Sequence, residues 1–276
     1  MKNNKIIEIK IQYVFFLLIT MFPLLIKGII CNDELMLRLW GQQGLDTFFK
    51  ITIFNENIGK GRILGILGNI KFLDYISESK YVYGVINVVF IITAVALFAY
   101  FVFQIVKEKA YCIFLGIFIV ALMPVTFEPS VPSQFVVVVL QPMILLELSM
   151  IFYMKYLEIC EMKYLAFSLV LFFWAMCLYE FIITYALMYF IIYLIKGTDF
   201  SIKKTIRDMA PFVSSAVLYL ALYIVQGRIA PTNYSGNTIQ ILSVFKVFRV
   251  IGVTVLTSLP GFYTFYSTKY RYLFNY

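Results

Sequence analysis

Histidine is missing from this chain of 276 residues, and charged residues make up only 14% of it. The absence of histidine excludes histidine-ligated zinc, a Ser-His-Asp triad and a histidine proton relay. The low charge content, against about 25% in a typical soluble domain, excludes a soluble globular protein. The four cysteines form no CxxC pair, so no zinc or redox motif is indicated. For Cys31 and Cys177 we expect buried free thiols, with a disulfide between them as the alternative.

Hydrophobic residues, by contrast, make up 62% of the chain and aromatic residues 18%. Such a composition excludes intrinsic disorder and predicts an all-α, polytopic transmembrane helical bundle that forms a single membrane domain over residues 1–276. The net charge of +8 is typical of basic loops that orient spans beside a bilayer, and we do not expect nucleic acid as a partner.

A helix needs about 20 apolar residues to cross the hydrocarbon of a bilayer, and the chain has about seven or eight such runs. The long run over residues 164–195 is interpreted as two helices with an outer bend at Tyr179-Glu180, and one kinked helix is the alternative. The last run either spans the membrane or lies on its surface, because Lys246 and Arg249 interrupt it. The expected spans are 11–30, 81–106, 111–125, 135–153, the pair within 164–195, 211–225 and 239–256.

The distribution of lysine and arginine predicts which ends of the spans face the cytoplasm. The expected cytoplasmic segments carry eleven of these residues and the outer segments seven, in keeping with the positive-inside rule. The N-terminus is therefore cytoplasmic, as are the charged turn Lys155–Lys163 and the segment Lys196–Asp208. Residues 31–80 form an outer loop with interfacial helices, and Gln226–Asn237 form another. The bias towards Ile, Lys, Asn and Phe favours a bacterial inner (plasma) membrane.

Two adjacent carboxylates, Asp33 and Glu34, begin the first outer loop. In a helix that starts there, Glu34 and Arg38 would lie one turn apart and could form an ion pair, while Asp33 could cap the helix. That purely structural interpretation and a catalytic one are both open from these residues alone.

The same loop contains Gly59-Lys60-Gly61-Arg62, in which the glycines allow the backbone to approach a ligand. Arg62 could hold a phosphate with two hydrogen bonds, and Lys60 could supply a point charge. Glu128 and Glu180 are expected on the same outer surface.

An ionisable residue within an apolar run is a functional candidate, and Glu180 fits that description best. Solvation at a helix bend is the structural alternative for Glu180. Glu147 lies within another apolar run, and we expect it to reach the inner interface or to pair with another helix.

Together these features resemble the GT-C class of membrane glycosyltransferases, and most closely the phage-type O-antigen glucosyltransferase family. The matching residues are Asn32-Asp33-Glu34 with Arg38, Gly61-Arg62 and Tyr179-Glu180. The region from Asn233-Tyr234-Ser235-Gly236 to Leu259-Pro260 is also similar. The chain departs from the family in two respects, because its acidic pair is Asp-Glu where Asp-Asp is commoner, and because family members have further spans after this point. The resemblance therefore implies a chain truncated at its C-terminus.

The resemblance implies transfer of a sugar from a polyprenyl-phosphate donor to a cell-surface glycan or lipid acceptor on the non-cytoplasmic face. Asp33 would be the base, and Glu34 would steer the acceptor or help Asp33 to hold a divalent cation such as Mg²⁺ or Mn²⁺. Phosphate binding would fall to Arg62, with Lys60 and Arg38. Sugar hydroxyls would be bound by Tyr179 and Glu180, with Glu128 as a further candidate.

Two alternatives to an enzyme follow from the same sequence. A carrier or flippase for a lipid-linked sugar would have broken helices with charges at the middle of the bilayer, often in two related halves. The chain has no obvious internal repeat, and its acidic residues are expected on one face. A non-catalytic, truncated membrane protein is the second alternative.

Overall fold

A computed structural model of the chain describes residues 43–51, 80–122, 139–197 and 202–229, and all regular elements in these ranges are helices. The predicted all-α class is confirmed for this part of the chain. The elements are α3 (Leu45–Phe48), α7 (Lys80–Val106), α8 (Lys109–Leu122), α9 (Gln141–Ile159), α10 (Met162–Leu178), the 3₁₀ helix η4 (Glu180–Tyr185), α11 (Ala186–Lys196) and α12 (Ile202–Ile229).

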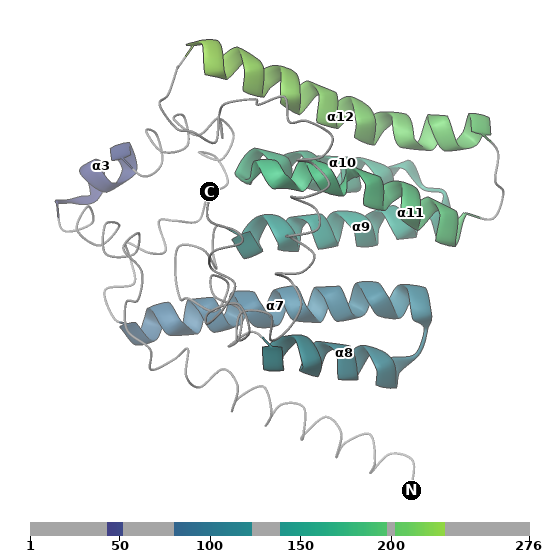
Figure 1. Cartoon of the computed structure of the whole chain (residues 1–276), viewed down its shortest axis with the longest axis horizontal. Helices are drawn as coiled ribbons and strands as arrows, with labels where there is room; N and C mark the ends of the chain where they lie inside the picture. Colours follow the sequence, from purple (N-terminus) through teal and green to yellow (C-terminus); the bar gives the residue numbers. More distant parts are fainter. Residues whose placement is uncertain (1–42, 52–79, 123–138, 198–201, 230–276) are drawn as a thin grey trace, which may run out of the picture.

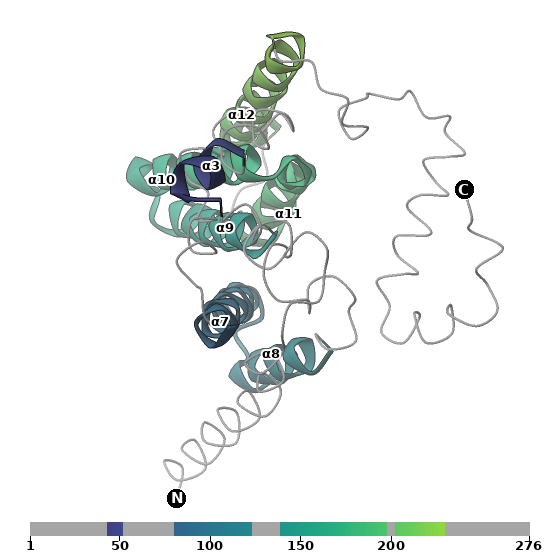
Figure 2. The same cartoon turned by 90° about the vertical axis from the view of Figure 1, so that its left-hand side faces the viewer.

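The long helices run roughly along one axis and form three groups (Figure 1). Helices α7 and α8 make an antiparallel hairpin, and α7 packs against α9. Helices α9, α10 and α11 form the centre, where α9 and α10 have the most extensive contact. Helix α12 crosses the outer side of α10 and α11, as the view along the bundle shows (Figure 2).

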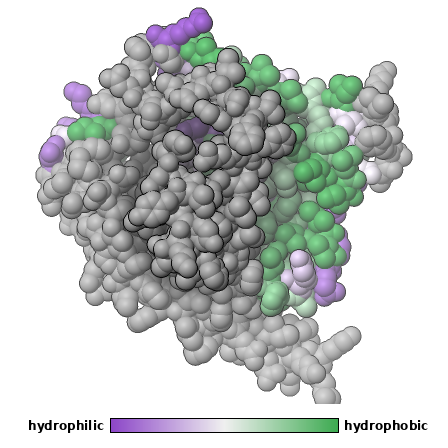
Figure 3. All heavy atoms as spheres, in the orientation of Figure 1, coloured by the Kyte–Doolittle hydropathy of each residue, from purple (hydrophilic) through white to green (hydrophobic). Residues whose placement is uncertain are grey.

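Two described helices are long and apolar enough to cross a membrane, over Gly84–Val106 and Thr205–Gln226. Apolar side chains also lie on the outside of the bundle, among them Val89 on α7, Phe167 on α10 and Val217 on α12. Figure 3 shows hydrophobic residues over most of the described surface that is visible from this side. Such a surface fits lipid better than water as the surrounding solvent.

Helix boundaries differ from the prediction at two charged segments. The segment Lys155–Lys163 was predicted to be a turn, but α9 continues to Ile159 and the turn is only Cys160-Glu161. The predicted Lys196–Asp208 segment likewise contains the first two turns of α12. Lysine and glutamate are good helix formers, so charge alone does not end a helix.

The bend at Tyr179-Glu180 is confirmed, and the single kinked helix is wrong. Helix α10 ends at Leu178, Tyr179 is extended with φ −153° and ψ 122°, and η4 begins at Glu180. Elsewhere Pro211, predicted to begin a span, lies inside α12. It has no N–H to donate, so α12 lacks one backbone hydrogen bond at that point.

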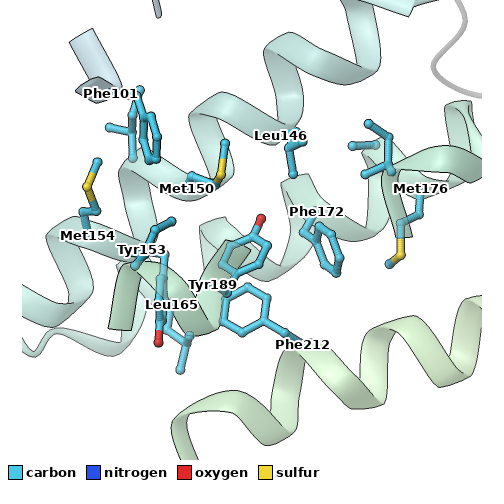
Figure 4. Close-up of a cluster of buried hydrophobic side chains, with 14 of the residues drawn as sticks. Phe101, Leu146, Met150, Tyr153, Met154, Leu165, Phe172, Met176, Tyr189 and Phe212 are labelled. Atoms are coloured by element: carbon cyan, nitrogen blue, oxygen red, sulfur yellow. The ribbon is translucent and has the colours of Figure 1, made fainter. Parts of the chain in front are cut away.

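Aromatic rings from four helices form the centre of the core (Figure 4). The rings of Tyr189 on α11 and Phe212 on α12 stack with centroids 3.9 Å apart. Tyr153 and Phe172 meet this pair edge-on, at distances of 5.0 to 5.9 Å. The cluster therefore joins α9, α10, α11 and α12 in a single packed unit.

The connection after α11 is tight at Gly197. Its N–H donates to the carbonyl of Tyr193 over 2.7 Å, and a Cβ at position 197 would lie only 2.6 Å from that same oxygen. The close approach requires glycine at this position.

Candidate functional site

The described bundle has two chemically different ends. The α7–α8 and α9–α10 links, the end of α11 and the start of α12 all lie at the right-hand end in Figure 1, whereas the junction of α10 and η4 lies at the opposite end. The right-hand end carries most of the described basic residues: Lys107, Lys109, Lys155, Lys163, Lys196 and Arg207. We refer to it as the basic end, and to the end with Tyr179-Glu180 as the junction end.

At the junction end, the extended backbone of Tyr179 separates α10 from η4 and leaves Tyr179 and Glu180 half-buried. The N–H of Tyr179 still donates to the carbonyl of Ala175, so α10 closes its last turn before the chain changes direction. The carbonyl of Tyr179 accepts from the N–H of Ile182. Backbone hydrogen bonds on both sides therefore fix the position of Glu180.

Three half-buried aromatic side chains accompany Glu180 along the chain. The rings of Tyr179 and Phe181 meet edge-to-face at 4.8 Å, and those of Phe181 and Tyr185 at 6.0 Å. A partly exposed aromatic group next to a carboxylate suits a sugar, because the rings can pack on the C–H face of a pyranose while the carboxylate accepts hydrogen bonds from its hydroxyls.

Phe181 and Tyr185 are absent from the predicted site, although the sequence contained a signal for them. The stretch from Tyr179 to Tyr185 places three aromatic residues around one acidic residue. Aromatic residues make up 18% of this chain, so three of them within seven residues are a weak signal.

Of the predicted site residues, only Tyr179 and Glu180 lie in the described part of the chain, where they adjoin at the junction end. Helix α3, from the predicted first outer loop, lies towards the same end (Figures 1 and 2). The remaining predicted site residues lie outside the described residues: Asp33, Glu34, Arg38, Lys60, Arg62 and Glu128.

Within the described residues, no three Asp, Glu, Cys or His side chains come together as a metal site. The predicted cation ligands Asp33 and Glu34 lie outside this part of the chain. Cys112, Cys160 and Cys177 are free thiols, and of these Cys112 and Cys177 are buried. The expectation of a buried free thiol at Cys177 is confirmed.

The centre of the bundle contains a group of three buried hydroxyls that sequence reasoning missed. Ser149 Oγ donates to the carbonyl of Ser168 over 2.6 Å, and Ser168 Oγ donates to the carbonyl of Ser149 over 2.8 Å. The hydroxyls of Ser149 and Tyr189 lie 2.5 Å apart. Each of the three hydroxyls has a hydrogen-bond partner, so the group links α9, α10 and α11 without leaving these polar groups unsatisfied.

The basic end holds ion pairs and one buried carboxylate. Lys196 pairs with Glu158 at 3.2 Å and so joins α11 to α9, while Lys163 pairs with Glu161. Asp208 is 3% exposed and accepts a hydrogen bond from Arg207 over 3.1 Å. Burial raises the pKa of Tyr156, the nearby Asp208 raises it further, and Arg207 lowers it.

Glu147 does not lie where it was expected. Its side chain is 4% exposed, and its Oε2 atom has no hydrogen-bond partner. It neither reaches an interface nor pairs with another helix, because α9 continues for three turns beyond it and turns its acidic side chain into the bundle.

Comparison with known proteins places no constraint on these assignments, since no protein-family model, curated protein or solved structure matches the chain.

Proposed function

We propose that the chain is a multi-pass membrane glycosyltransferase that moves a sugar from a polyprenyl-phosphate donor to a glycan or lipid acceptor at the junction end. The observation that carries the proposal is the position of Glu180. In the sequence it falls between Tyr179 and Phe181, whose rings contact each other edge-to-face, and it lies at a helix break at the end of the bundle opposite the basic turns.

The distribution of charge supports the orientation that this reaction requires. Lysine and arginine near the ends of membrane helices favour the cytoplasmic side, and the basic end carries most of those in the described residues. The junction end then faces the non-cytoplasmic side of a bacterial inner membrane, and the N-terminus is cytoplasmic. Donor and acceptor would both be reached from that outer surface.

The chemistry divides between the junction end and the first outer loop. Tyr179 and Glu180 would bind the hydroxyls of the sugar, with Glu128 as a further candidate. Asp33, which lies outside the described residues, would accept the proton of the acceptor hydroxyl. The hydroxyl oxygen then bonds to the anomeric carbon, the bond from that carbon to the phosphate oxygen breaks, and polyprenyl phosphate leaves.

Three cationic residues of the same loop would stabilise the departing phosphate. Arg62, with Lys60 and Arg38, would neutralise the charge that develops on the leaving group. Glu34 would steer the acceptor, or with Asp33 would hold a divalent cation that neutralises the same charge.

The proposal is tested by mass analysis of the surface glycans of cells that carry variants of the intact gene. Replacing the carboxylate of Glu180 in Glu180→Gln removes a charge-assisted hydrogen bond worth about 1.5–3 kcal/mol, which lowers transfer by about 10- to 100-fold. Asp33→Asn removes the base and lowers transfer by about 10²- to 10⁴-fold.

Glu158→Gln is the matched control, since Glu158 lies at the basic end and pairs with Lys196. It is expected to leave the glycans unchanged. Normal glycan modification by Asp33→Asn and Glu180→Gln, at normal levels of protein in the membrane, would rule out the proposed roles of both residues.

A further inference from the structure

Glu147 is a buried carboxyl group that the proposed sugar transfer does not use. It lies on α9, the helix at the centre of the bundle, which contacts α7, α10, α11 and η4. Its side chain is 4% exposed, and Oε2 has no hydrogen-bond partner. Glu147 therefore has a polar atom that is enclosed in the bundle without a hydrogen-bond partner.

The position of Glu147 along α9 places it well away from both ends of the helix. At 1.5 Å per residue, it lies about 9 Å from Gln141 and about 18 Å from Ile159. An aqueous surface at either end is too far for a side chain of this length to reach.

No described cation neutralises Glu147. The charged residues of the helices around α9 are found near the helix ends, where Lys163 pairs with Glu161 and Lys196 with Glu158. Neither those lysines nor any tyrosine or cysteine of these helices makes an ion pair or hydrogen bond with the Glu147 carboxyl. The other charged residues on α9, on the helices around it and on α12 are Lys80, Lys155, Glu180, Lys203, Lys204, Arg207, Asp208 and Arg228.

An ionised carboxylate without a partner is far more costly to bury than a neutral carboxylic acid, and the cost is greater still within a bilayer. We therefore propose that Glu147 is a proton-binding site inside the bundle, occupied by a proton at neutral pH. This inference is independent of the proposed sugar transfer and holds whether or not the chain is an enzyme.

A packing role does not account for a carboxyl at this position. The hydroxyl of Ser149, two residues further along α9, is also buried, but it has partners on both α10 and α11. The Oε2 atom of Glu147 makes no comparable contact. An apolar residue of similar size would fill the same volume without the cost of an unsatisfied polar atom. The unpartnered carboxyl thus lowers the stability of the bundle relative to such an apolar residue.

A hydrophobic carbodiimide, dicyclohexylcarbodiimide, tests the proposal because it reacts with protonated carboxyl groups in apolar surroundings. The carboxyl proton moves to one nitrogen of the reagent, and the carboxyl oxygen bonds to its central carbon. The acyl group then migrates to nitrogen and leaves a stable acylurea on the side chain. Peptide mass mapping of the full chain in its native membrane locates the label.

We expect dicyclohexylcarbodiimide to label Glu147 about tenfold or more above Glu158, because Glu158 lies at the exposed basic end and pairs with Lys196. Labelling of Glu147 should fall as the pH is raised. A water-soluble carbodiimide with an added amine, applied to opened membranes, should label the exposed Glu161 and leave Glu147 unmodified.

Two variants complete the test. Glu147→Gln imitates the protonated acid, so the variant protein should unfold at the wild-type temperature. The peptide that contains residue 147 should no longer carry the carbodiimide label. Absence of label at Glu147 in the folded wild-type chain would overturn the proposal. So would labelling by the water-soluble reagent to the extent seen at Glu161, or unfolding caused by Glu147→Gln but not by the matched change Glu158→Gln.

Discussion

The hydroxyl of Ser149 connects three helices through a single oxygen atom. It bonds to the carbonyl of Ser168 on α10 and lies 2.5 Å from the hydroxyl of Tyr189 on α11. All three side chains are fully buried. Loss of the Ser149 hydroxyl would leave the hydroxyl of Tyr189 with one fewer partner in an apolar interior.

Ser149→Ala is expected to lower the free energy of unfolding by about 0.5–2 kcal/mol, the range measured for hydrogen bonds between membrane helices and for buried hydroxyls. Unfolding of the purified protein in detergent, followed by circular dichroism, measures this loss. Ser215→Ala is the control. The Ser215 hydroxyl bonds only to the carbonyl of Pro211 in its own helix, so this change should be near neutral. Equal effects of the two changes would show that the three-helix link contributes nothing.

At this scale the sequence predicts single residues unevenly. The bend at Tyr179-Glu180 could be predicted, because the apolar run around it is too long for one span and carries a charge near its middle. Ser149, Ser168 and Glu147 could not, since their roles depend on which side of a helix faces which neighbour. When helices are apolar nearly all round, the hydrophobic periodicity of the sequence gives little information about which side of each helix faces its neighbours.

At the scale of helices, Phe212 is the residue of α12 that lies in the central cluster of aromatic rings. Its ring is 1% exposed and contacts Tyr153, Phe172 and Tyr189, which belong to three other helices. The next residue, Val213, is 56% exposed. Substitutions at these two neighbouring positions therefore distinguish a residue of α12 that packs against protein from one that faces the surroundings.

Phe212→Ala is expected to lower the free energy of unfolding by an amount near the lower end of about 3–5 kcal/mol. The change leaves a cavity among the rings, but lipid also solvates apolar groups that are not packed, which reduces the loss. Limited proteolysis should cut the link between α11 and α12 faster in this variant. Val213→Ala should leave both the proteolysis rate and the unfolding free energy close to wild type. If Val213→Ala has the larger effect, α12 packs with its other face inwards.

Helices were easier to predict from the sequence than their boundaries. The start and end of α7 agree with the predicted span within one residue, since Lys107-Glu108 ends an uninterrupted apolar run. The boundary after α9 was wrong because Lys155 and Glu158 continue the helix. Pro211 was predicted to begin a span, because proline is favoured at the first turn of a helix, but it lies inside α12.

At the scale of the whole molecule, Cys160 tests the orientation of the bundle directly. It is the exposed cysteine among the described thiols and lies in the α9–α10 turn at the basic end. In a Cys31→Ser background, a membrane-impermeant maleimide should label Cys160 in inverted membrane vesicles and not in intact cells.

A cysteine introduced at the junction end by Glu180→Cys should show the opposite labelling. Buried Cys112 and Cys177 should stay unlabelled in both preparations, which provides an internal control. Labelling of Cys160 from outside intact cells would place the junction end in the cytoplasm and would exclude sugar transfer at the outer surface.

The close approach at Gly197 limits how this gene can vary. Every other amino acid carries a Cβ, and a Cβ here would lie 2.6 Å from the carbonyl oxygen of Tyr193. To relieve that overlap the last turn of α11 would have to open, which would draw Lys196 away from Glu158. Any substitution of Gly197 is therefore expected to weaken the contact between α11 and α9 at the basic end, even though Gly197 lies far from Glu180.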